Sequence, residues 1–86
     1  MTTLQAKQLV QGLGGSENIK DLESCIVRIR AIVHDPAKVD EATIRGTNPL
    51  GVVFSGQYVQ IIVGKESDEI VAQMDELINP SPVSAT

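Results

Sequence analysis

β-Branched residues dominate residues 26–33, and this segment restricts the fold more than any other part of the chain. It reads Ile-Val-Arg-Ile-Arg-Ala-Ile-Val, a composition typical of a β-strand. With a side-chain period of two, Arg28 and Arg30 share one face of the strand. The opposite face is apolar and consists of Val27, Ile29, Ala31 and Val33. We therefore expect a strand with one buried face and one open face.

Helical and extended patterns alternate along most of the chain. Apolar residues at helical spacing predict helices at 3–12, 35–46 and 68–78. Extended segments predict strands at 18–24, 26–34, 51–54 and 58–63. We expect Asp35 and Ser67 to cap the second and third helices. Because short links join the strands in pairs, this order predicts a two-layer α+β domain, with a four-stranded antiparallel sheet and three helices on one face.

The chain length of 86 residues suffices for a single small core. We expect one domain over residues 1–78, followed by a flexible tail or linker over 79–86, where Pro and Ser are frequent and periodicity ends. No apolar run reaches the roughly 20 residues that span a bilayer. The first residues also lack the basic and apolar segments of a secretory signal. The sequence therefore predicts a cytoplasmic protein.

Charge and cysteine content exclude two kinds of site. The net charge is −4 and no Lys/Arg-rich run is present, which argues against binding to the phosphates of nucleic acids. Cys25 is the single cysteine and His34 the single histidine, too few for a Cys/His zinc site or an internal disulfide. We expect no metal and no cofactor.

Cys25 begins the segment in which chemistry is most plausible. A thiol reacts as the thiolate, and nearby guanidinium groups favour that anion. A phosphoryl group on the sulfur would add about −1.5 to −2 charges, by analogy with other phosphorylated side chains. Arginine suits such a group, because its planar fork bonds phosphate oxygens in pairs and stays charged. Arg28 and Arg30 share a face close to Cys25, so the three side chains can address one ligand.

Simpler interpretations of the same residues remain open at this point. A lone free cysteine is most often an inert, buried small residue. Alternating arginines most often mark the solvated face of an edge strand. His34, at a strand end, is more readily structural than catalytic, and Asp35 is better explained as a helix cap than as an acid or base.

Two motifs add a family resemblance. Residues 13–19 read Leu-Gly-Gly-Ser-Glu-Asn-Ile, and residues 25–30 read Cys-Ile-Val-Arg-Ile-Arg. Together they resemble the signature of the enzyme IIB component of the bacterial phosphoenolpyruvate-dependent sugar phosphotransferase system (PTS), in its glucose and N-acetylglucosamine class. Further similarity at 39–40, 51–53, 59–64 and 74–76 extends the resemblance over roughly residues 5–78.

The resemblance implies a phosphocysteine intermediate. Cys25 would accept a phosphoryl group from a histidine of the IIA component and pass it to glucose or N-acetylglucosamine bound by the membrane IIC component. Arg28 and Arg30 would bind the phosphate and assist the transfer to sugar. The family's fold is the one predicted above. The protein would then be a protein-phosphocysteine–sugar phosphotransferase, monomeric alone, that meets the inner face of the cell membrane through IIC.

Val27 departs from the family pattern, in which threonine is usual at this place. A hydroxyl that could bond a phosphate oxygen is therefore missing. This difference supports an alternative, a non-catalytic regulatory or interaction module on the same fold. A thiol-based redox or acyl-carrying enzyme is a third possibility, against which the lack of a second cysteine argues.

Overall fold

The computed structural model describes residues 2–79 of the chain. Three α-helices and four strands follow one another as α1 (Thr2–Gly12), β1 (Ile19–Cys25), β2 (Arg28–Val33), α2 (Glu41–Arg45), β3 (Gly51–Ser55), β4 (Tyr58–Ile62) and α3 (Ser67–Ile78). Short 3-10 turns at Ser16–Asn18 and Pro36–Lys38 precede β1 and α2. The tail predicted at 79–86 lies outside the described residues, apart from Asn79.

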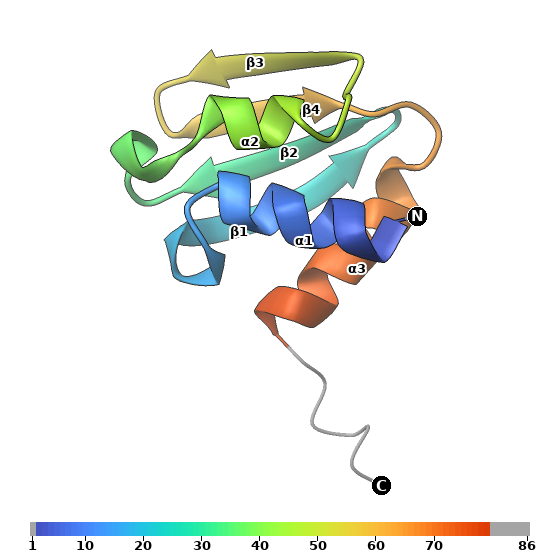
Figure 1. The fold of residues 1–86 in the computed structure, drawn as a ribbon, viewed down its shortest axis with the longest axis horizontal. Helices are drawn as coiled ribbons and strands as arrows, with labels where there is room; N and C mark the ends of the chain where they lie inside the picture. The colour runs from blue at the N-terminus through green and yellow to red at the C-terminus, as the bar shows by residue number, and fades with distance from the viewer. Residues whose placement is uncertain (1, 80–86) are drawn as a thin grey trace, which may run out of the picture.

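The strands form one antiparallel sheet in the order β1-β2-β4-β3, and the helices lie on one side of it (Figure 1). The predicted two-layer α+β fold is therefore confirmed. β2 and β4 are the central strands, although they are far apart in the sequence. Their side chains alternate as the period of two requires.

The core fills the space between the helices and the inner face of the sheet. Ile29, Ala31 and Val33 of β2 are fully buried, and Ile61 of β4 joins them. The helices contribute Leu9, Ile44, Ile70 and Met74, and Leu13 joins them from the turn after α1. Burial of these aliphatic groups drives the packing of the two layers, at roughly 25 cal/mol per Å² of apolar surface. No helix of the described residues lies on the opposite face of the sheet (Figure 1).

Several predicted boundaries differ from those of the structure. β1 extends through Cys25, and β2 begins only at Arg28, because the residues between them form a tight turn. The predicted helix at 35–46 is split: Asp35 accepts a hydrogen bond from the amide of Ala37 and starts the 3-10 turn, while Asp40 accepts one from Thr43 and starts α2. Two successive aspartates thus begin two short turns instead of one helix.

The predicted cap of α3 is also wrong. Glu66 is the N-cap and makes no side-chain capping bond, while Ser67 is the first helical residue. The hydroxyl of Ser67 is directed to another partner, described below. None of the helices within residues 2–79 has both the length and the apolar character needed to cross a membrane.

Candidate functional site

Cys25 is the last residue of β1 and lies directly opposite Arg28, the first residue of β2. Residues that face each other in an antiparallel pair project to the same side of the sheet. Since Ile29 next to Arg28 points into the core, Cys25 and Arg28 both project from the open face. The thiol is partly exposed and free. The thiol is therefore not buried in the core, and it lies on the same face as Arg28.

Ile26 and Val27 form a two-residue turn between these strands. Ile26 has a φ of 59°, a conformation that a β-branched residue adopts only rarely. Its side chain is 85% exposed. The sequence contains none of the usual turn residues here, so the turn could be located but not described in advance.

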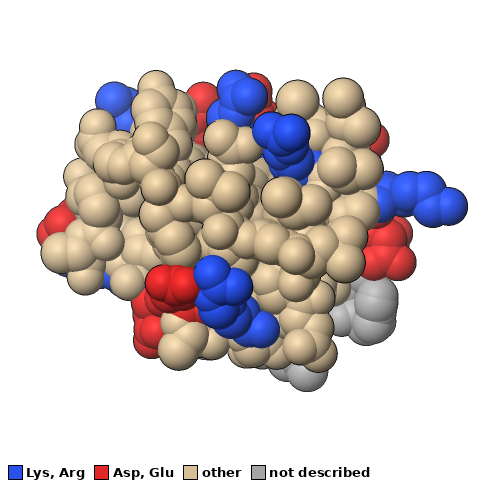
Figure 2. Space-filling view, turned by 90° about the horizontal axis from the view of Figure 1, so that it is seen from above, with Lys and Arg blue, Asp and Glu red and all other residues tan. Residues whose placement is uncertain are grey.

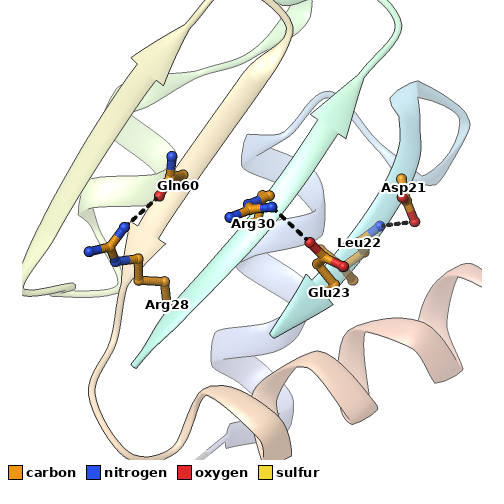
Figure 3. Close-up of polar contacts among 6 residues, drawn as sticks. All are labelled: Asp21, Leu22, Glu23, Arg28, Arg30 and Gln60. Carbon is orange, nitrogen blue, oxygen red and sulfur yellow. Dashed lines mark hydrogen bonds and ion pairs between the residues drawn. The ribbon is translucent and has the colours of Figure 1, made fainter. Parts of the chain in front are cut away.

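Arg28 and Arg30 both have partners on the open face, opposite α1 and α2 (Figure 3). Arg28 donates from Nη1 to Oε1 of Gln60 over 3.2 Å. Arg30 forms an ion pair with Glu23, with 3.1 Å between Nη1 and Oε2. Both Glu23 and Gln60 lie opposite Arg30 in the strand register, on β1 and β4 respectively. The two guanidinium groups and Cys25 therefore belong to one continuous surface.

The sequence alone did not identify Glu23 and Gln60 as members of this surface. Both become neighbours of the arginines through strand pairing, and the pairing of β2 with β4 joins segments about 30 residues apart. A signal for Glu23 did exist, because in a tight hairpin a residue two before Cys25 must lie opposite the residue two after Arg28. No comparable local signal existed for Gln60.

Large apolar residues are also exposed on the open face and near it. Figure 2 looks from above Figure 1, toward the β3 side, and the middle of this view is largely uncharged, with basic and acidic groups around it. The exposed large apolar residues near the open face and its rim are Ile26, Leu50, Val53 and Tyr58. Ile62, opposite Arg28, is partly buried. Such a surface can accept a protein partner around the thiol.

Two other residues considered in the sequence lie away from this surface. His34 is exposed, beyond the end of β2, and its carbonyl accepts a hydrogen bond from Gln57. Asp35 begins the 3-10 turn, in agreement with a capping role. Within residues 2–79 no group of three or more His, Cys, Asp or Glu side chains could hold a metal ion. The open face thus brings one thiol and two guanidinium groups together, with Glu23 and Gln60 as partners of the arginines.

Comparisons with known proteins identify relatives of this chain. The family model described as phosphotransferase system, EIIB matches residues 7–40. A Streptomyces coelicolor protein named "PTS system N-acetylglucosamine-specific EIIB component" is 39% identical over 74 residues, which cover 86% of this chain and 96% of that protein. The "PTS system N-acetylglucosamine-specific EIICBA component" of Klebsiella pneumoniae is 34% identical over 84 residues, 96% of this chain but only 13% of that protein.

A solved structure shows the same fold. One domain of the PTS system IIabc component from Clostridium difficile superposes with a TM-score of 0.71 and 23% sequence identity. The match covers 94% of this chain and 82% of that domain. At this identity the likeness concerns the fold alone.

Proposed function

The chain belongs to the EIIB family of the phosphotransferase system, and from this premise we propose that it carries a phosphoryl group on Cys25 during sugar uptake. The observation that carries the proposal is the direct pairing of Cys25 with Arg28 on the open face of the sheet. A partly exposed thiol beside fixed cations suits a nucleophile that must meet two partners in turn.

Two transfers make up the proposed reaction. In the first, the Cys25 sulfur attacks the phosphorus of a phosphohistidine on the IIA component, so that an S–P bond forms and the N–P bond breaks. In the second, a sugar hydroxyl held by IIC attacks the same phosphorus, the S–P bond breaks, and Cys25 leaves as thiolate. The hydroxyl proton passes to a base on the sugar-binding component. Both steps spread negative charge over the phosphoryl oxygens.

Arg28 and Arg30 are proposed to stabilise that charge. A guanidinium group can bond two phosphoryl oxygens at once and remains charged throughout. Arg28 is the partner of Cys25 in the strand register, while Arg30 lies one position further along the same face. We assign Arg28 and Arg30 to phosphate binding and to the transfer to sugar, with Cys25 as nucleophile and carrier.

The partners and sugar follow from the names of the relatives. The Klebsiella relative bears a name that combines EIIC, EIIB and EIIA, which supports work together with IIA as donor and IIC as sugar-binding membrane component. Both relatives are named for N-acetylglucosamine, and we propose this sugar in preference to glucose. The chain would then work at the inner face of the membrane, in contact with IIC.

A regulatory role on the same fold is the second candidate, and Val27 is the observation that favours it. Val27 lies in the turn next to Cys25 and supplies no hydroxyl to a phosphate. In this role the chain would bind the IIA or IIC component without accepting a phosphoryl group, and the Cys25 thiol would not react.

Intact mass separates the two candidates. The full chain is incubated with phosphoenolpyruvate, the general transfer proteins and a IIA component, and an EIIB known to be active serves as positive control. We expect the addition of one phosphate, and its loss in Cys25→Ser. If the positive control is labelled and this chain is not, phosphoryl transfer by Cys25 is contradicted and the regulatory role is supported.

A further inference from the structure

The two neighbours of Cys25 in the chain are both bonded to the first turn of α3. The hydroxyl of Ser24 donates to Oδ1 of Asp68. The hydroxyl of Ser67 donates to the backbone carbonyl of Ile26 over 2.6 Å. Cys25, the nucleophile of the proposed reaction, therefore lies between two residues that are both bonded to α3, a helix that begins about forty residues later in the chain.

Ser67 is the more deeply placed of these contacts. The residue is fully buried, and it is not the N-cap of α3, a position that Glu66 occupies. Its hydroxyl is therefore not required to begin the helix, and it donates a hydrogen bond to the carbonyl of Ile26 instead. The buried hydroxyl of Ser67 thus bonds to a strained turn that follows Cys25 directly, so it can affect the position of that residue.

The bond acts on the central peptide of the turn. Ile26 has positive φ and Val27 does not, which is the pattern of a type II′ turn. Rotation of the peptide that joins them would give the type I′ pattern, with positive φ at both residues. The carbonyl of that peptide is the one that Ser67 holds. The amides of Val63 and Gly64 bond only to the next carbonyl, that of Val27.

We propose that Ser67 is a positioning residue for phosphoryl transfer, whose buried hydroxyl locks the Ile26–Val27 peptide and so sets the direction of Cys25 relative to Arg28. Cys25 and Arg28 are the first and last residues of this turn and pair in the strand register, so we infer that a change of turn type shifts the thiol relative to the guanidinium group. A misplacement of about 1 Å can cost about 100-fold in rate. The inference rests on the proposed function, since it concerns the efficiency of the same sulfur.

Ser67→Ala in the full chain tests this role. Alanine fits the space of serine and favours the helix, so the fold should persist. We expect kcat for phosphoryl acceptance from IIA to fall about tenfold or more, with KM for IIA unchanged. Ser55→Ala, an exposed serine at the end of β3, is the matched control and should keep the original rate. A Ser67→Ala protein that loses stability but keeps its kcat would overturn the proposal.

A second-site substitution tests the mechanism. Glycine favours the first central position of a type II′ turn, so Ile26→Gly should hold the turn without help from the hydroxyl. We expect Ser67→Ala/Ile26→Gly to recover most of the kcat lost in Ser67→Ala, measured against Ile26→Gly alone. Failure of this rescue, with both proteins folded, would contradict control through the turn.

A structural measurement separates this inference from the proposed function. The φ angle of Val27, obtained by NMR from backbone couplings and chemical shifts, should move toward positive values in Ser67→Ala and return in the double variant. An unchanged φ would overturn the role of Ser67 even if transfer slows. If the original chain takes no phosphate at all, the proposed function fails, while the φ of Val27 still shows whether Ser67 holds the turn.

Discussion

Arg28 and Arg30 differ in what an incoming phosphate must displace from them. Arg28 is bonded to the neutral amide of Gln60, whereas Arg30 is paired with the carboxylate of Glu23. An exposed ion pair contributes only about 0–1 kcal/mol, while hydrogen bonds to charged groups reach about 1.5–3 kcal/mol. In the proposed reaction, a phosphoryl group on Cys25 would replace a neutral partner at Arg28 and an exposed carboxylate at Arg30.

Replacement of either arginine by lysine should affect the two transfers unequally. Lysine keeps the positive charge but loses the paired hydrogen bonds of the guanidinium fork. We expect Arg28→Lys and Arg30→Lys to slow transfer to sugar by about tenfold or more, and to slow acceptance from IIA much less. The two half-reactions are measured separately by rapid quench. Arg45→Lys on α2 is the control, and equal losses in both half-reactions would contradict the assignment.

Glu23→Gln should make the thiol more reactive. The change removes a negative charge from the face that carries Cys25 and releases Arg30 from its ion pair. Both effects make the surroundings of the sulfur more positive. We expect faster alkylation of Cys25 by iodoacetamide at neutral pH. Glu41→Gln, which breaks the exposed pair with Arg45, is a matched control and should leave the rate unchanged. An equal or slower rate in Glu23→Gln would count against electrostatic contact between Glu23 and the site.

At the scale of elements, the two hairpins of the sheet differ in the chemistry of their turns. Each has a two-residue turn whose first residue has a φ near 60°, Ile26 in one and Gly56 in the other. Glycine adopts such a φ freely, whereas a β-branched residue is strained there. The β3–β4 turn therefore follows the usual preference, and the turn beside Cys25 does not. Strain of this kind is found most often at functional sites.

Reciprocal substitutions should reveal this strain. Ile26→Gly should raise the free energy of unfolding by about 1 kcal/mol, the net of relieved strain and the greater freedom of glycine in the unfolded chain. Gly56→Ala should lower it by about 1 kcal/mol, although nothing lies within 4 Å of the added methyl group. Urea unfolding followed by circular dichroism measures both. A loss of stability in Ile26→Gly would show that Ile26 is not strained.

At the scale of the whole molecule, negative charge is in excess, and one place shows its effect. Burial, together with the charges of Asp21 on β1 and the neighbouring Glu76, raises the pKa of the Asp75 carboxyl from its usual 3.8. The folded state then holds this proton more tightly than the unfolded state. The free energy of unfolding consequently falls as the pH rises from the usual carboxyl pKa through the raised pKa of Asp75. Above the raised pKa, ionised Asp75 destabilises the folded state to its full extent.

Asp75→Asn should remove that cost. At pH 7 we expect a gain in stability of less than about 1 kcal/mol, because the site is largely exposed to solvent. The gain should disappear below the usual carboxyl value, where Asp75 is protonated in both states. Thermal unfolding over a series of pH values measures the difference. Glu17→Gln also removes one negative charge, from the 3-10 turn before β1, so an equal gain there would assign the effect to total charge and not to Asp75.

The fold and the centre of the site could largely be predicted from local patterns. Alternation along residues 26–33 correctly put Ile29 in the core and both arginines on the open face. Helix starts were less predictable, because Asp, Ser and Glu can each begin a turn and only packing selects among them. Ser67 illustrates this: its hydroxyl bonds to Ile26, across 41 residues, and not to its own helix.

The amino-acid order by itself determined the faces of the strands, the two-layer architecture and the family signature around Cys25. These follow from periodicity and motif, which act over a few neighbouring residues. Only the tertiary structure decided that Gln60 meets Arg28 on the open face and that the buried Ser67 bonds to the β1–β2 turn. Such contacts depend on strand register and on the seating of α3 against the β1–β2 hairpin, which the whole core sets at once.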